Sequence, residues 1–161
     1  MPDETSSLRV LVYDAPDGPL TDLPSLFAGF GWETDYSAGW LWASLEGSPP
    51  DAVVVEASVP GGPRGPWFGK LVEEYLAAPV IVATRTRSLS QALGYFRAGA
   101  TDYQPVPAAP ADWQARVTES IFRRHRLVQG VAAVDAWPVH ADPETDILAE
   151  LARDETGSTG G

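Results

Sequence analysis

Three oxygen-bearing side chains each end an apolar, β-branched run of the sequence. Asp14 ends VLVYD, Glu56 ends AVVVE, and Thr84 ends VIVAT. Continuous runs of this kind are typical of parallel strands that are covered on both faces. Because the carboxyl ends of parallel strands meet at one rim of a sheet, we expect the three side chains to lie together there. Such a rim could hold a metal ion or a small ligand.

Amphipathic stripes separate these strands, and their apolar residues recur at helical spacing. We expect helices at residues 20–30, 40–45, 68–76, 89–97 and 112–129. Two further strands are expected at 101–104 and at 32–36, of which the second is more polar and therefore nearer an edge. This alternation predicts an α/β fold, a doubly wound, five-stranded parallel sheet with five helices, (βα)₅.

The composition narrows the class of protein and its partners. The chain has 161 residues, of which 44% are hydrophobic, a formal net charge of −11, and no Cys. Such a chain is globular, forms no disulfides or thiolate metal sites, and is not expected to bind nucleic acid or an anionic membrane. The polar start and the lack of an apolar run of about 20 residues lead us to expect a cytoplasmic protein.

The alternation of strands and helices stops near residue 128. We expect one domain at residues 7–128 and an acidic linker or tail at 129–161, with a short helix at 143–153. The sequence ends in TGSTGG, a composition that is typical of flexible linkers.

Four segments, in order, carry a resemblance to a known family. Asp14 after the first strand, DAVVVEASVPGG at 51–62, PVIVATR at 79–85 and AGATDYQPVP at 98–107 resemble the receiver domain of bacterial response regulators. The resemblance covers about residues 7–127 and implies the flavodoxin-like receiver fold. It also implies a role in two-component signal transduction or a phosphorelay, in which a histidine kinase phosphorylates an aspartate after the third strand.

In that family, acids after the first strand hold Mg²⁺, and a Ser/Thr and a Lys at the ends of the last two strands bind the phosphoryl group. This sequence departs from the pattern at three positions. Glu56 stands at the acceptor position, Ala15 replaces a second acid, and Val106 stands at the Lys position. The extra methylene of Glu moves the carboxylate by about 1 Å, which can cost on the order of 10²-fold in a positioned reaction.

The resemblance therefore implies a degenerate phosphoacceptor pocket that consists of Asp14, Glu56, Thr84 and Val106. Tyr103 matches the aromatic residue whose rotamer reports activation in family members. We expect neither a bound metal nor a cofactor, and Asp14 and Glu56 are the candidate ligands if Mg²⁺ binds at all.

These departures predict an atypical receiver domain, a pseudo-receiver, that acts by protein–protein interaction and not by ordinary aspartyl phosphorylation. We expect no enzymatic activity. The alternatives are a small-ligand-gated regulatory module and a residual Mg²⁺-dependent phosphoacceptor. Glu56 itself has three open interpretations: a fixed mimic of a phosphoryl group, a structural carboxylate, or a site for a metal or small ligand.

The expected partner is another protein or a fused output domain. By resemblance, the contacts would use the fourth helix, the fifth strand and the fifth helix, and a homodimer would form through the fourth and fifth helices. The basic run at 123–126 ends the fifth helix. Its cations either offset the helix dipole or contact an acidic partner.

Overall fold

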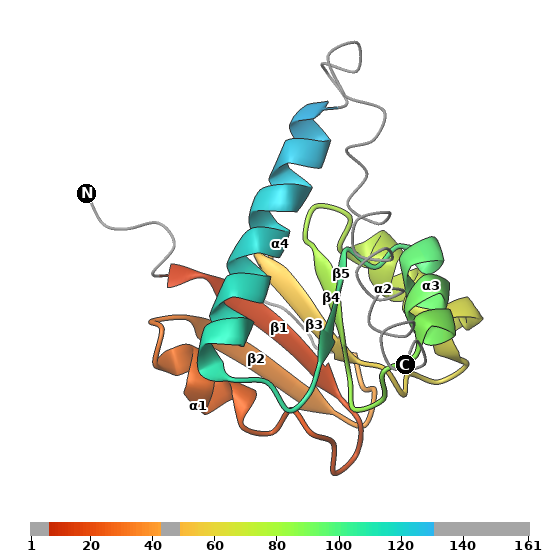
Figure 1. Ribbon diagram of the computed structural model, residues 1–161, viewed down its shortest axis with the longest axis horizontal. Helices are drawn as coiled ribbons and strands as arrows, with labels where there is room; N and C mark the ends of the chain where they lie inside the picture. Colours follow the sequence, from red (N-terminus) through yellow and green to blue (C-terminus); the bar gives the residue numbers. More distant parts are fainter. Residues whose placement is uncertain (1–6, 43–48, 131–161) are drawn as a thin grey trace, which may run out of the picture.

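The computed structural model describes residues 7–42 and 49–130, with only the backbone of the last four. Five parallel strands form one sheet in the order β2-β1-β3-β4-β5 (Figure 1). The strands are β1 (Arg9–Asp14), β2 (Glu33–Ala38), β3 (Ala52–Glu56), β4 (Val80–Thr84) and β5 (Asp102–Pro105). The polar strand β2 lies at one edge, as its sequence predicts, because only the inner strands need two apolar faces.

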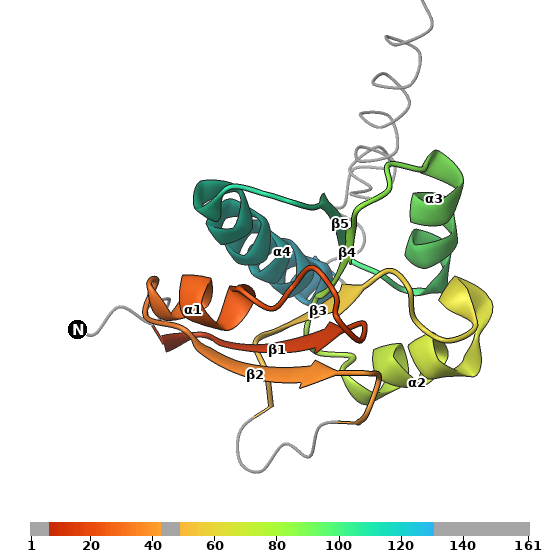
Figure 2. The ribbon, with the colours of Figure 1, turned by 90° about the horizontal axis from the view of Figure 1, so that it is seen from below.

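Four α-helices and a short 3₁₀ helix accompany the sheet in the described residues. They are α1 (Leu23–Ala28), η2 (Gly62–Arg64), α2 (Pro66–Glu74), α3 (Leu89–Ala98) and α4 (Pro110–Gly130). Figure 2 shows α1 and α4 over one face of the sheet and α2 and α3 over the other. The doubly wound α/β fold is therefore confirmed. In the part of the chain that the structure describes, no helix combines the length and apolar character that a membrane span requires.

The two faces of the sheet bury two separate apolar clusters. Leu11 and Tyr13 of β1 belong to the cluster beneath α2 and α3, while Val10 and Val12 belong to the cluster beneath α1 and α4. This division follows from the alternation of side chains along a strand. Both clusters combine residues of the β-branched runs with apolar residues of the covering helices and loops.

The prediction of a helix at residues 40–45 is wrong for residues 40–42, which are not helical. Residues 43–48 lie outside the described residues. Gly39 and Trp40 have φ angles of 81° and 67°, in the left-handed region, which turn the chain as β2 ends. The carbonyl oxygen of Trp40 accepts a hydrogen bond of 3.1 Å from Nε1 of Trp67 on α2. The chain here is therefore held by a side chain of α2 and not by helical bonds.

Aromatic rings cover the sheet at this place. The Trp67 ring packs edge-on against the buried Tyr13 ring at 5.1 Å and stacks on Trp42 at 5.0 Å with an interplanar angle of 11°. Trp40 packs edge-on against Trp67, and the ammonium group of Lys70 lies 4.7 Å from the centre of the Trp42 ring. Such ring pairs contribute about 0.5–1.5 kcal/mol each beyond the area that they bury.

A buried carboxylate joins α4 to the sheet. Asp102, at the start of β5, is fully buried and accepts hydrogen bonds from Arg116 at 2.9 Å, from Arg123 at 3.0 Å and from the hydroxyl of Ser120 at 2.8 Å. All three donors come from α4, and the backbone N–H of Tyr103 adds a fourth bond. Because two guanidinium groups face one carboxylate, the buried charge is compensated.

We predict that Asp102→Ala lowers the free energy of unfolding by about 2–3 kcal/mol, since hydrogen bonds to charged groups contribute about 1.5–3 kcal/mol. The two arginines keep side-chain exposures of 29% and 20%, so they can recover water as a partner. Urea unfolding measures the loss. Asp22→Ala, at an exposed helix start with no side-chain cap bond, is the matched control. Equal stabilities of the two variants would contradict the assignment.

Candidate functional site at the carboxyl rim of the sheet

The strand register brings three of the predicted site residues to one rim. Tyr13 pairs with Val55, so Asp14 and Glu56, the next residues, end neighbouring strands side by side. Glu56 in turn pairs with Ala83, which directly precedes Thr84. The backbone N–H of Val106 donates to the carbonyl oxygen of Thr84 at 2.8 Å, so the position expected for a lysine also lies at this rim.

Asp14 is fully buried, and hydrogen bonds from its own chain occupy its carboxylate. One oxygen accepts from the backbone N–H of Ala15 at 2.9 Å. The other accepts from the N–H of Leu20 at 3.0 Å and from the hydroxyl of Tyr36 on β2 at 2.7 Å. A Cβ at Gly18 would lie 1.9 Å from the first oxygen, so the loop backbone closes over the carboxylate. These donors stabilise the buried group without a metal ion or a cation.

Glu56 binds to the start of its own loop. One carboxylate oxygen accepts from the backbone N–H of Ser58 at 2.7 Å, and the other lies 3.1 Å from the Ser58 hydroxyl. Glu56 is 6% exposed, so these bonds replace much of its contact with water. The Glu side chain, which is longer than that of Asp, contacts Ser58 two residues later in the chain. This local contact caps the turn after β3.

Thr84 and Tyr103 belong to a separate network that joins β4 and β5 to α3. The Thr84 hydroxyl lies 3.1 Å from the Thr86 carbonyl oxygen and 3.1 Å from Oε1 of Gln91. The Tyr103 hydroxyl lies 3.0 and 2.9 Å from the same two acceptors. Two hydroxyl protons thus meet two acceptors, and both buried groups are satisfied. Tyr103, the aromatic residue predicted as a switch, is 3% exposed.

The tyrosine hydroxyls around the rim act as donors. Burial raises the pKa of Tyr103, and its hydrogen bonding with Thr84 only partly offsets the effect. Burial, together with the nearby Glu56 charge, raises the pKa of Tyr95, whose hydroxyl donates to the carbonyl oxygen of Ala57 at 2.5 Å. Desolvation and the hydrogen bond to Asp14 raise the pKa of Tyr36. All three groups therefore keep their protons at neutral pH.

Val106 lies in the apolar cluster beneath α1 and α4 and is 8% exposed. It offers no charge to the rim. Within residues 7–42 and 49–130, no group of three or more His, Asp or Glu side chains is arranged to hold a metal ion. Asp14 and Glu56 stay the candidate ligands, but the donors described above already bind both of them.

Sequence reasoning missed three residues that shape this site, namely Tyr36, Ser58 and Gln91. Signals for them exist. Tyr36 pairs with Val12, two residues before Asp14, on the strand predicted as an edge. Ser58 follows Glu56 by two positions, a spacing at which a side-chain oxygen can accept from a backbone N–H. Gln91 lies three residues after Ser88, whose side chain caps α3 by accepting from the Gln91 N–H.

The parallel order β2-β1-β3-β4-β5 with helices on both faces is the fold of response-regulator receiver domains, and solved structures of that class match this one. A CheY-like receiver domain from Methanospirillum hungatei JF-1 has 18% sequence identity and a TM-score of 0.58, over 74% of this chain and 97% of its own. The receiver domain of an HD domain-containing protein from Pseudomonas fluorescens Pf-5 has 19% identity and a TM-score of 0.60, over 74% and 98%.

A third similar structure, a putative response regulator from Chloroflexus aurantiacus J-10-fl, has 22% identity and a TM-score of 0.58, over 73% of this chain and 99% of its own. No protein-family model and no curated protein matches the sequence. At these identities the similarity establishes the receiver fold, which agrees with the sequence-based expectation.

We predict that Gln91→Ala lowers the free energy of unfolding by about 1–3 kcal/mol, because one of two buried hydroxyl protons loses its acceptor. Urea unfolding measures this loss, and tyrosine ring signals in NMR spectra report the release of Tyr103. Gln114→Ala, at an exposed position of α4, makes the same chemical change without touching the network. If the Gln91 variant is as stable as the control, the network does not fix α3.

Proposed function

We propose that this chain is an atypical receiver domain, which signals through protein–protein contacts without ordinary aspartyl phosphorylation. The receiver fold supports a role in signal transduction. The finer proposal rests on the rim, where backbone N–H groups and side-chain hydroxyls of the chain itself donate to both carboxylates. A cytoplasmic location, the absence of a cofactor and the absence of enzymatic activity stay predictions that accompany this proposal.

The hydrogen bonds of Asp14 carry the proposal. A Mg²⁺ ion would have to displace donors from Ala15, Leu20 or Tyr36, each bond to a charged group contributing about 1.5–3 kcal/mol. Mg²⁺ also demands nearly ideal octahedral geometry from its oxygen ligands. Val106 provides no positive charge to offset the charge that a phosphoryl group would add.

Glu56 fits a structural role best among its three interpretations. A mimic of the phosphoryl group would have to bind Thr84, but the Thr84 hydroxyl interacts with Thr86 and Gln91. Glu56 instead binds Ser58, through both of its oxygens. The carboxylate then stabilises the turn after β3, and the α3 network is complete without it.

We predict no gain in intact mass when the protein is incubated with Mg²⁺ and acetyl phosphate, and no magnesium-dependent change in tryptophan fluorescence. A typical receiver domain under the same conditions controls for the phosphodonor. The addition of one phosphate, mapped to Glu56, would overturn the proposal in favour of a residual phosphoacceptor.

A thermal-shift screen with metabolites tests the small-ligand alternative, because a ligand that binds only the folded state raises the melting temperature.

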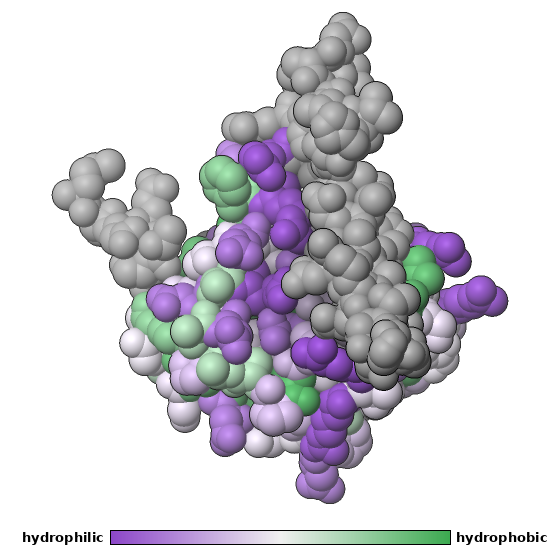
Figure 3. Space-filling view, viewed as in Figure 1, coloured by the Kyte–Doolittle hydropathy of each residue, from purple (hydrophilic) through white to green (hydrophobic). Residues whose placement is uncertain are grey.

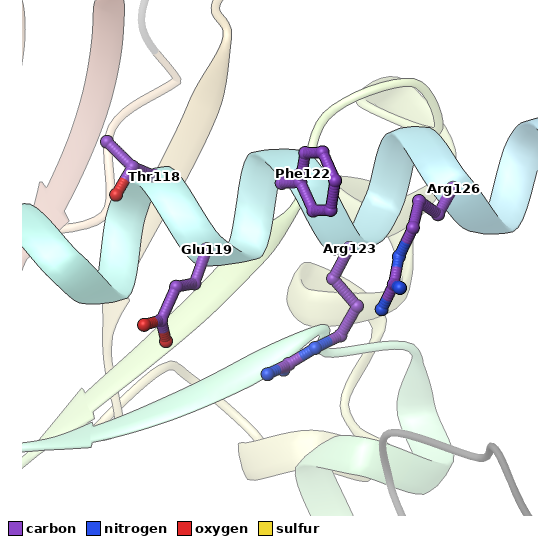
Figure 4. A pocket seen from close by; sticks show the side chains of 5 residues that line it. All are labelled: Thr118, Glu119, Phe122, Arg123 and Arg126. Carbon is purple, nitrogen blue, oxygen red and sulfur yellow. The ribbon is translucent and has the colours of Figure 1, made fainter.

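The expected partner surface corresponds to α3, β5 and α4, and the expected homodimer uses α3 and α4. We propose that the second copy contacts the outer face of α4. Figure 3 shows that hydrophilic residues dominate the view along α4. Phe122 is 62% exposed there, and the Arg126 guanidinium lies 5.3 Å from the centre of its ring. A hollow of about 290 Å³ beside them is lined by Thr118, Glu119, Phe122, Arg123 and Arg126 (Figure 4).

This face of α4 is self-complementary in charge. Glu119 and Arg126 lie on either side of Phe122, so two antiparallel copies of α4 related by a two-fold axis near Phe122 would place Glu119 of one copy opposite Arg126 of the other. Arg123 is not available for this contact, because its guanidinium group binds Asp102.

We predict that Phe122→Ser weakens self-association at least about tenfold, since loss of a buried Phe contact of about 2 kcal/mol exceeds one decade in affinity. Sedimentation velocity over a concentration series measures the dimer. Leu41→Ser, at a side chain that is 72% exposed elsewhere, is the matched control. A wild-type protein that stays monomeric, or a variant that associates equally well, would contradict the dimer and leave the absence of phosphorylation untouched.

A further inference from the structure

The positive charge of this acidic chain is concentrated around α3 and the loop that packs on it. Residues 57–72 and 84–101 contain Arg64, Lys70, Arg85, Arg87 and Arg97 and no Asp or Glu. The whole chain has 11 Lys and Arg and a net charge of −11. These two segments thus carry a net positive charge on an acidic chain, and such a charge favours negatively charged partners.

A groove lies within this region, between η2 and α3. It has a volume of about 550 Å³, and its apolar lining comes from Pro63, Leu93 and Ala98. Arg64 and Arg97 line it from opposite elements, and Ser90 adds a hydroxyl. Helix η2 lies close to α3 here: a Cβ atom added at Gly94 would lie 2.9 Å from the Pro63 ring. The absence of a side chain at Gly94 permits this approach.

The two arginines of the groove are exposed, and neither has an ion-pair partner within the described residues. Arg64 and Arg97 differ in this respect from Arg116 and Arg123 on the other face of the sheet, which form ion pairs with Asp102. An apolar groove with an uncompensated cation from each of two elements fits a peptide that alternates apolar and acidic residues.

We propose that the groove between η2 and α3 binds the acidic segment 142–155 of the same chain. That segment contains six Asp and Glu, one Arg, and the apolar residues Ile147, Leu148 and Leu151. At helical spacing these three apolar residues share one side, and Asp146 and Glu150 lie next to each other along its edge. The apolar side matches the lining of the groove, and the acidic pair matches Arg64 and Arg97.

The length of the intervening chain permits this contact. Eleven residues, 131–141, separate the end of α4 from the segment, and at about 3.3–3.6 Å per residue they span about 36–40 Å. A domain of this size has a radius of gyration of about 13 Å, so the groove lies within reach. Tethering gives the segment an effective concentration on the order of 1 mM, so even a weak contact is populated.

Paramagnetic NMR on the full chain tests this proposal, and the lack of any Cys in the sequence makes an introduced one unique. A nitroxide attached to Ser158→Cys is predicted to reduce the amide signals of Arg64, Gly65 and residues 93–98 at least about twofold at low salt. Raising the salt to about 0.5 M, where the Debye length is about 4 Å, is predicted to restore most of the lost intensity.

Charge variants locate the contact. Arg64→Glu with Arg97→Glu is predicted to abolish the signal loss, and adding Asp146→Arg with Glu150→Arg is predicted to restore it. Gln114→Glu, which adds a negative charge at an exposed position of α4, is predicted to leave the loss unchanged. Signal loss elsewhere, or loss that survives in the Arg64/Arg97 variant, would overturn the proposal. Loss in isotope-labelled protein mixed with a separate nitroxide-labelled copy would assign the groove to a second molecule and would equally overturn it.

Discussion

A carboxylate that is fully buried at the end of a central strand must find its hydrogen bonds within the protein, and Asp14 imposes this constraint on its surroundings. Its donors come from the loop after β1, through Ala15 and Leu20, and from the edge strand, through Tyr36. The loop therefore closes over the carboxylate, with Gly18 against it, and β2 is tied to β1 by a side chain as well as by its ladder. No ion is needed to stabilise the charge.

The remainder of the rim divides into two parts that share no side chain. Glu56 binds Ser58 within its own loop, while Thr84 and Tyr103 share Gln91 with α3. Here each part is satisfied separately, so the position of α3 is set by the protein's own side chains. Tyr95 of α3 also donates to the carbonyl oxygen of Ala57 in the loop after β3, and η2 packs on α3, so both contacts further fix the position of this helix.

The sequence was most informative where a physical pattern is local. The β-branched runs predict the inner strands because both of their faces are buried, and the polar segment ending in Tyr36 predicts an edge strand for the converse reason. The same logic places Asp14, Glu56 and Thr84 at one rim, since each directly follows an apolar run. The register of the strands agrees with that placement.

Other features could not be predicted because they depend on contacts between distant segments. Trp40 resembles a helical residue by its apolar neighbours, but Trp67, 27 positions later, binds its carbonyl oxygen. Tyr36 lies 22 positions from Asp14, and Gln91 lies 12 positions from Tyr103. The sequence shows Val106 where the resemblance implies a lysine, whereas the donors to Asp14 become visible only when the strands are paired.

A crystal structure determined after soaking in Mg²⁺ tests the central claim most directly. We expect no ion at the rim, with the Tyr36 hydroxyl still about 2.7 Å from the Asp14 carboxylate and Glu56 still bound to Ser58. An octahedral ion between Asp14 and Glu56, with the Tyr36 hydroxyl displaced, would contradict the account.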